Sequence, residues 1–133
     1  MDNTNTQATQ LHTEINEWKE MVRLVRDETR IFENQLQSIV KFWDGSEAMK
    51  YVQKFESQFI RQREVSDEFE HDLKLADHNI REWMQQVHSG NVLSAPDHTL
   101  LRDKALTYQK LFLELRDDFR QFAAALQNAR SLN

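Results

Sequence analysis

The sequence predicts a single all-α domain over residues 1–133, an elongated antiparallel three-helix bundle whose long, coiled-coil-like helices run up, down and up again. Apolar residues recur at alternating spacings of four and three, which places them on one stripe of a helix. The chain has only two glycines and one proline, so few turns interrupt the helices. Apolar residues make up 39% of the chain and charged residues 29%, a balance that supports a packed core and excludes a disordered chain.

The first helix is expected over residues 8–43, after a polar stretch at 1–7 that is expected to be disordered. Its apolar stripe, broken by a single threonine, comprises Leu11, Ile15, Trp18, Val22, Val25, Thr29, Phe32, Leu36, Ile39 and Trp43. Asp44 and Gly45 follow as a turn dipeptide. Ser46, with an acidic residue after it, suits the N-cap of the next helix.

The second helix is expected over residues 46–89 and the third over 95–130. The stripe of the second comprises Ala48, Val52, Phe55, Phe59, Gln62, Ser66, Phe69, Leu73, Ala76, Ile80, Trp83 and Val87. The stripe of the third comprises Leu101, Ala105, Tyr108, Phe112, Leu115, Phe119, Phe122, Leu126 and Ala129. Gly90 suits the position just past a helix end. Ser94 and Asp97 have the spacing of a capping box for the third helix.

Polar residues enter the stripes near the middle of the bundle. Short loops make neighbouring helices antiparallel, which puts Thr29 at the level of Gln62 and brings Phe119 to the same level. The predicted polar layer consists of Glu28, Thr29, Gln62 and Ser66. Buried polar groups need hydrogen bonds, so we interpret the layer as a network that fixes helix register. The alternative is a small ligand site with Glu28 as its charged member.

The stretch "DEFEHDLKLADHN" contains two spacings that occur in functional sites. Glu68 and His71 have the ExxH spacing of ferritin-like di-iron bundles, but such a site takes a second ExxH helix and further inward-facing glutamates. His71 lies about 200° around the helix from Phe69 and faces away from the stripe, so no metal site is predicted. His71 and Lys74 have the HxxK spacing of histidine phosphotransfer domains, in which the lysine helps to neutralise a phosphoryl group. A phosphotransfer protein is therefore one alternative function, and a ligand- or metal-binding bundle is another.

Several apolar residues lie off the main stripes and form a candidate interaction surface. They are Leu24, Ile31, Ile60, Leu75, Leu106 and Leu113. Heptad-spaced pairs among them either widen the intramolecular core or mark a surface for self-association, including a homodimer, or for docking of another helix between two helices.

Composition and charge exclude several classes of function. The net charge of −5, with both signs interspersed, disfavours nucleic acids and anionic membranes as partners. The chain has no cysteine, so thiolate catalysis and Cys-type zinc sites are excluded. No apolar run is long enough to span a bilayer, no secretory signal is visible, and no phosphate-binding glycine loop or other cofactor motif occurs. We therefore expect a soluble cytoplasmic protein without a cofactor.

The segments "FESQFIRQREVSDEFEHDLK" and "LLRDKALTYQKLFLELRDDFRQF" resemble small all-helical proteins of Bacteroidetes bacteria. The resemblance covers most of the helical chain. It implies a bacterial cytosolic protein and brings no activity, substrate or site residue. The residues and the resemblance together favour a non-catalytic protein-interaction or structural module.

Overall fold

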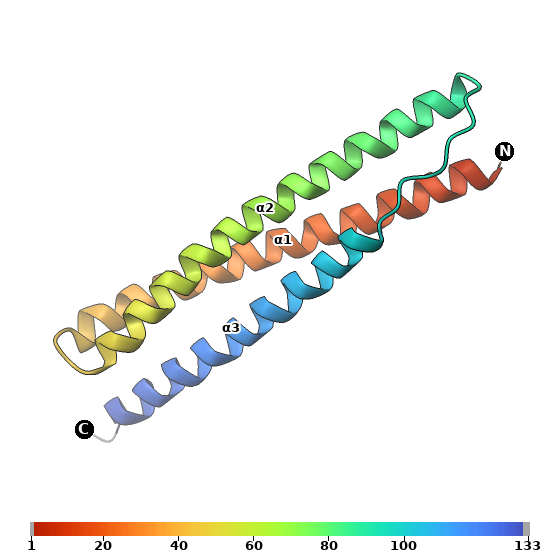
Figure 1. The fold of residues 1–133 in the computed structure, drawn as a ribbon. Coiled ribbons are helices and arrows are strands. Elements are labelled where there is room, and N and C mark those ends of the chain that lie inside the picture. The colour runs from red at the N-terminus through yellow and green to blue at the C-terminus, as the bar shows by residue number, and fades with distance from the viewer. Residues whose placement is uncertain (1, 132–133) are drawn as a thin grey trace.

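The computed structural model describes residues 2–131 and the side chains of 3–130. It consists of three helices, α1 (Asp2–Trp43), α2 (Ala48–His88) and α3 (Thr99–Ser131). The helices lie side by side along a rod, with α2 antiparallel to α1 and α3 parallel to α1 (Figure 1). The described residues contain no strand. The predicted fold class, an all-α three-helix bundle, is confirmed.

The start of α1 differs from the expectation, because residues 2–7 are helical rather than disordered. Ala8 is buried in the core, so the apolar contacts of α1 begin one turn before Leu11. The hydroxyls of Thr9 and Thr13 donate hydrogen bonds to carbonyl oxygens one turn earlier, 2.9 Å and 2.8 Å away. Burial of Ala8 stabilises the added first turns of α1, since tertiary packing supplies most helix stability.

The turn between α1 and α2 lies at the predicted Asp44 and Gly45, but α2 begins at Ala48, two residues later than predicted. Gly45 has a φ of 77°, in the left-handed region that favours glycine. The Oγ of Ser46 accepts a hydrogen bond from the backbone N–H of Ala48 at 3.2 Å, which satisfies one of the donors that a helix start leaves free. The predicted N-cap is nevertheless wrong by one position, because Glu47 occupies the N-cap of α2 and its side chain makes no capping hydrogen bond.

The third helix begins at Thr99, four residues later than predicted. The Asp97 carboxylate accepts hydrogen bonds from the backbone N–H of Thr99 at 2.9 Å and from its hydroxyl at 2.7 Å. These bonds hold the pKa of Asp97 below its ordinary value. The predicted capping box is wrong in its first member, because Ser94 lies in the extended segment before the helix and Asp97 itself satisfies the first turn.

The linker between α2 and α3, residues 89–98, is extended and runs back alongside the bundle (Figure 1). It turns at Gly90, whose φ is 93°, and the Trp83 Nε1–H donates a hydrogen bond to the Leu93 carbonyl oxygen at 3.2 Å. Because the linker runs back alongside the bundle, α3 begins at a level well before the C-terminal end of α2. This displacement sets the level of every residue in α3.

The displacement corrects the predicted pairing of α2 with α3. Tyr108, and not Phe119, lies beside Ser66, with 2.6 Å between their hydroxyl oxygens. Phe119 instead packs against Phe55 and Phe59, with ring centroids 5.3 Å and 5.2 Å away. The prediction failed because it assumed a tight turn between the two helices, whereas the linker is long and extended.

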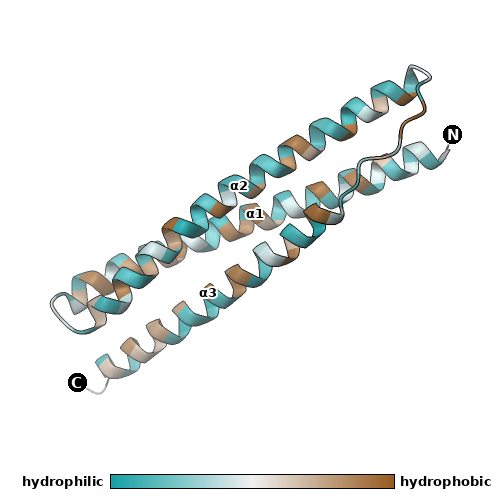
Figure 2. Cartoon of the chain, in the orientation of Figure 1, coloured by the Kyte–Doolittle hydropathy of each residue, from teal (hydrophilic) through white to brown (hydrophobic). Residues whose placement is uncertain are grey.

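The core follows the predicted stripes. Its buried apolar residues are Ala8, Leu11, Ile15, Val22, Val25, Phe32, Leu36, Val52, Phe55, Phe59, Phe69, Leu73, Ile80, Trp83, Ala105, Tyr108, Phe112, Leu115 and Phe119. Apolar residues recur along all three helices (Figure 2). The backbones of α1 and α2 approach closely, whereas α3 stands farther from both, because large aromatic rings fill the space between.

Ion pairs between helices add to the alignment. Arg26 of α1 contacts Asp67 and Glu70 of α2, at 2.8 Å and 2.6 Å. Lys104 of α3 contacts Asp72 of α2 at 3.0 Å. The hydrogen bond from Arg26 is the main cause that lowers the pKa of Glu70. Such partly exposed pairs contribute little stability individually, but they favour one relative position of the helices over others.

Candidate functional site

An apolar groove lies between α1 and α3 and is called the α1–α3 groove below. It encloses a hollow of ≈ 720 Å³. Its lining residues are Glu17, Trp18, Glu20, Met21, Leu24, Val25 and Glu28 from α1, and Arg102, Ala105, Leu106, Gln109, Phe112 and Leu113 from α3. The groove exists because α3 stands away from α1, so side chains beside the core of each helix are left without a neighbour.

The floor and the walls of the groove are both apolar. Val25, Ala105 and Phe112 are buried and form its floor. The walls carry Leu24, which is 51% exposed, and Leu106, which is 67% exposed. Exposing large apolar side chains to water is unfavourable, and a contiguous apolar patch of this kind is typical of an interaction surface.

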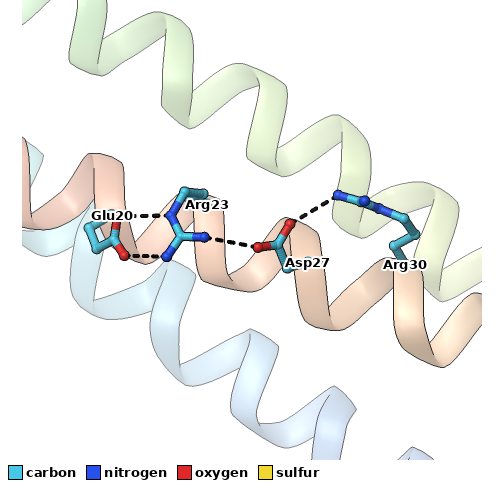
Figure 3. Close-up of polar contacts among 4 residues, drawn as sticks. All are labelled: Glu20, Arg23, Asp27 and Arg30. Atoms are coloured by element: carbon cyan, nitrogen blue, oxygen red, sulfur yellow. Dashed lines mark hydrogen bonds and ion pairs between the residues drawn. The ribbon is translucent and has the colours of Figure 1, made fainter.

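Acidic residues dominate the charged rim of the groove. Glu20 is held by Arg23, which continues through Asp27 to Arg30 in a chain of ion pairs along α1 (Figure 3). Glu17 and Glu28, in contrast, make no hydrogen bond or ion pair with any residue from 3 to 130. The rim of α1 therefore offers two carboxylates that are not neutralised within the described part of the chain.

Arg102 lies at the end of the groove and is already engaged. Its Nε and Nη2 donate hydrogen bonds to the Glu14 carboxylate at 2.6 Å and 2.8 Å. This bidentate contact is the main cause that holds the pKa of Glu14 below its ordinary value. It also joins the first turn of α3 to α1 and fixes the level at which the two walls of the groove face each other.

The structure brings together three of the six predicted surface residues. Leu24, Leu106 and Leu113 share the α1–α3 groove, although Leu113 is half-buried and also packs on the core. The other three are exposed elsewhere. Ile31 lies outside the groove on α1 and Ile60 lies on α2.

Leu75, the last of these residues, borders a small hollow of ≈ 190 Å³ between α2 and the start of α3. Its place there depends on the late start of α3. The predicted surface therefore divides into one shared groove and three separate positions.

Sequence reasoning missed part of the groove. Met21 and Glu17 line it, and so does Gln109 on the other wall. A signal was available, because Glu17, Met21 and Leu24 continue a second alternating four-and-three series beside the main stripe of α1. Three-helix bundles use wider apolar stripes than two-stranded coiled coils, so this second series marks the side of α1 that faces α3.

The predicted polar layer is assembled only in part. Thr29 and Ser66 are both buried and line one hollow of ≈ 350 Å³ between α1 and α2. Ser66 hydrogen-bonds to Tyr108, while Thr29 donates to the carbonyl oxygen of Val25 in its own helix at 2.7 Å. Gln62 is buried, and its Nε2 donates no hydrogen bond within the described chain.

Glu28 does not belong to this layer, because it lies on the other side of α1 in the α1–α3 groove. Tyr108 belongs to the layer instead of Glu28 and is the hydrogen-bond partner of Ser66. Burial raises the pKa of the Tyr108 phenol, and its hydroxyl would be costly to bury without Ser66. The layer therefore behaves as a small hydrogen-bonded contact between α2 and α3.

His71 and Lys74 both lie on the exposed side of α2. The Lys74 ammonium is 3.2 Å from a carboxylate oxygen of Glu70, so its charge is already shared within the helix. His78, one heptad after His71, contacts Glu82 at 3.2 Å. Among the described residues, no group of three or more His, Asp or Glu side chains is placed to hold a metal ion.

His98 is a buried residue that sequence reasoning did not single out. Its side chain is nearly inaccessible, and neither ring nitrogen has a hydrogen-bond partner in the described chain. Nδ1 lies 3.6 Å from a Glu14 carboxylate oxygen, and the ring contacts Trp18 with 6.2 Å between centroids. Its burial depends on where the linker joins α3, which the sequence pattern does not reveal.

Two further hollows flank α3. One of ≈ 530 Å³ lies near the C-terminal ends of α1 and α3, where the Arg130 guanidinium covers the Phe42 ring at 4.1 Å from its centroid. The other, of ≈ 350 Å³, lies between α2 and α3, with Leu100 and Leu111 at its edge. Both hollows are smaller than the α1–α3 groove. The Arg130 side chain already lies over the apolar surface of the 530 Å³ hollow.

Comparisons with protein-family models, curated proteins and solved structures found no match. The resemblance to helical proteins of Bacteroidetes bacteria therefore stays a prediction. No helix in the described range 2–131 is long and apolar enough to cross a bilayer. The candidate site consequently depends on the geometry and chemistry of the groove itself.

Proposed function

We propose that the protein is a non-catalytic interaction module that binds an amphipathic helix in the α1–α3 groove. The observation that carries the proposal is the pair of half-exposed leucines, Leu24 and Leu106, on facing walls of one apolar hollow. A helix that lays its apolar face into a groove is a recurrent mode of protein recognition. Burying each leucine removes apolar surface from water, at roughly 25 cal/mol per Å².

A pair of matched variants tests the proposal. Leu24→Glu should abolish binding, because it places a charge in the groove wall, whereas Leu111→Glu should not. The two residues are 51% and 52% exposed, but Leu111 borders the hollow between α2 and α3. Tagged wild-type protein and both variants are purified from the native host, and the proteins retained with each are identified and then bound again in purified form.

The expected result is a stoichiometric helical partner, which includes a second copy of the chain, that is lost only with Leu24→Glu. Circular dichroism and thermal unfolding show whether each variant keeps its fold. Leu106→Glu serves as a second variant on the opposite wall. If Leu24→Glu and Leu106→Glu both leave every association unchanged, the groove is not the binding site and the proposal is wrong.

A further inference from the structure

We propose that the helix that occupies the α1–α3 groove is α3 of a second copy of this chain, antiparallel to α3 of the first, about a two-fold axis at Gln109. The inference rests on the proposed function and names its partner. A two-fold interface uses the same surface on both copies, so one face of this chain must complement itself. Sequence and charge on α3 and α1 meet that requirement.

The groove side of α3 has the same order of residue types in both directions. Arg102, Leu106, Gln109 and Leu113 line the groove at spacings of four, three and four, and Arg116 continues the series three residues beyond it. In an antiparallel pair centred on Gln109, Leu106 of one copy lies one residue, about 1.5 Å, from the level of Leu113 of the other. Arg102 lies at the level of Arg116. The apolar residues of the two helices therefore meet each other. The arginines lie at the outer ends, where Arg102 is already paired with Glu14 and Arg116 with Asp117.

Gln109 gives this pair a defined centre. It lines the groove, and it lies between the two leucines on the same side of α3. At the axis it faces its own symmetry mate, and a glutamine side chain offers both a donor and an acceptor for a reciprocal hydrogen bond. A polar residue inside an apolar contact of two helices is a known means of fixing their register.

The level of α1 relative to α3 brings opposite charges together. Arg102 contacts Glu14, and both helices run in the same direction, so Met21 lies at the level of Gln109. The two-fold axis then places Leu106 of the second copy at the level of Leu24. It also places Lys110 of the second copy at the level of Glu20 of α1. Glu17 is three residues from Glu20, a rise of about 4.5 Å, and so lies within one helical turn of Lys110.

Lys110 and Glu17 are suited to such a contact. Lys110 is exposed on α3, one turn from Leu106 and from Leu113. Neither Lys110 nor Glu17 has an ion-pair partner in the described chain. In the dimer each copy supplies both charges, so the contact occurs twice. The second copy thus covers the exposed leucines and neutralises a carboxylate that a single copy leaves open.

Single cysteines test the geometry, because the natural chain contains none. Gln109→Cys should form a disulfide-linked dimer on mild oxidation, since the two thiols meet at the axis. Gln53→Cys, exposed on α2, is the control for random collision. Leu106→Cys and Leu113→Cys should each cross-link poorly alone and efficiently when mixed, because only an antiparallel pair joins these two positions.

Charge reversal tests the same interface without altering its apolar part. Glu17→Lys and Lys110→Glu should each weaken self-association several-fold in analytical ultracentrifugation, and the double variant should restore it. Leu106→Glu should make the protein monomeric, and thermal unfolding should show that it remains folded. Self-crosslinking of Leu106→Cys or Leu113→Cys as efficient as that of the mixture would indicate parallel helices and overturn the proposal.

The outcomes separate this inference from the proposed function. If the wild-type protein stays monomeric throughout the accessible concentration range, and Gln109→Cys cross-links no faster than Gln53→Cys, the second copy is not the occupant. The proposed function would then stand only if another purified helical partner bound in a Leu24-dependent manner. Absence of any Leu24-dependent association, with itself or with another protein, would overturn both.

Discussion

The two ends of the bundle differ in what packs against the α1–α2 pair. Near the turn between α1 and α2, α3 supplies the third side, and Phe119 contacts the rings of Phe32, Phe55 and Phe59. At the opposite end α3 has not yet begun, and the linker covers the pair instead (Figure 1). We call these the three-helix end and the linker end.

The side chains of the core differ accordingly. The three-helix end is filled by phenylalanine, because three helices leave a wide space between their axes. At the linker end the buried residues include Ala8, Leu11 and Ile80, which suit a closer pairing of two helices. Residues 89–91 of the linker hydrogen-bond to the last turn of α2, and Trp83 holds the linker again at Leu93. The linker ends at His98, whose ring nitrogens have no hydrogen-bond partner in the described chain. The comparison indicates that buried phenylalanine rings are concentrated in the part of the core that α3 covers.

The largest expected effect comes from truncating the aromatic cluster. Phe119→Ala should reduce the free energy of unfolding by about 3–5 kcal/mol, because it removes a fully buried ring and leaves a cavity among its neighbours. Leu11→Ala, at the linker end, should cost about 2 kcal/mol, since fewer groups surround it. Urea unfolding of both variants measures the difference. Equal losses would contradict the contrast between the two ends.

The buried hydroxyl pair should give the next largest effect. Ser66→Ala leaves the Tyr108 hydroxyl buried without its partner, which should cost about 1–3 kcal/mol. Adding Tyr108→Phe removes the orphaned group, so the double variant should lose less stability than the sum of the two single variants. Thermal unfolding of all four proteins completes the cycle. Additive losses would show that the two hydroxyls do not depend on each other.

The tie between the linker and α2 should have a smaller and more local effect. Trp83→Phe keeps an aromatic ring but removes the N–H that bonds to Leu93, and should cost about 0.5–1.5 kcal/mol. Amide hydrogen exchange in the linker and the first turn of α3 should accelerate. Trp43→Phe, beside the turn between α1 and α2, is the control and should leave exchange in the linker unchanged.

The smallest effect is expected for the ion pair of Glu14 with Arg102. The pKa of Glu14 is lowered in the folded protein, so the carboxylate stabilises the fold above its unfolded pKa of about 4.3, and this contribution is lost as the pH falls further. Glu14→Gln should cost about 0.5 kcal/mol at neutral pH, because the pair is partly exposed, and nothing at strongly acidic pH. Urea unfolding at both pH values measures the loss.

Glu56→Gln is the control for this prediction. Glu56 is exposed and has no ion pair in the described chain, so its stability difference from wild type should not change with pH. A pH-independent loss for Glu14→Gln would mean that the residue contributes through packing and not through its charge.

The helices and their inner faces were predictable because they depend on spacing along the chain. The alternating series identified the core of α1 and α2 almost residue by residue, and the chemistry of Gly45 and Ser46 located the turn between them. Local hydrogen bonding and apolar periodicity act within a few residues, so a single sequence contains them. The start of α3 was less accurate because an extended linker leaves no periodic signal.

Several residues of the candidate site were predictable from the sequence, but their arrangement was not. Leu24, Leu106 and Leu113 were recognised as residues off the main stripes, but the pattern gave no reason to place them together or to separate them from Ile60. Their meeting depends on the level at which α3 docks. Glu28, which the pattern placed in a polar layer, lies in the groove for the same reason.

The sequence by itself determined that this protein consists of three long helices with one apolar stripe each, since periodicity and turn residues are local properties of the chain. Only the tertiary structure decided how far α3 is displaced along the α1–α2 pair, because that distance depends on the path of the linker and on the space that Phe119 and its neighbours require. The displacement pairs Ser66 with Tyr108, buries His98 and opens the groove between Leu24 and Leu106.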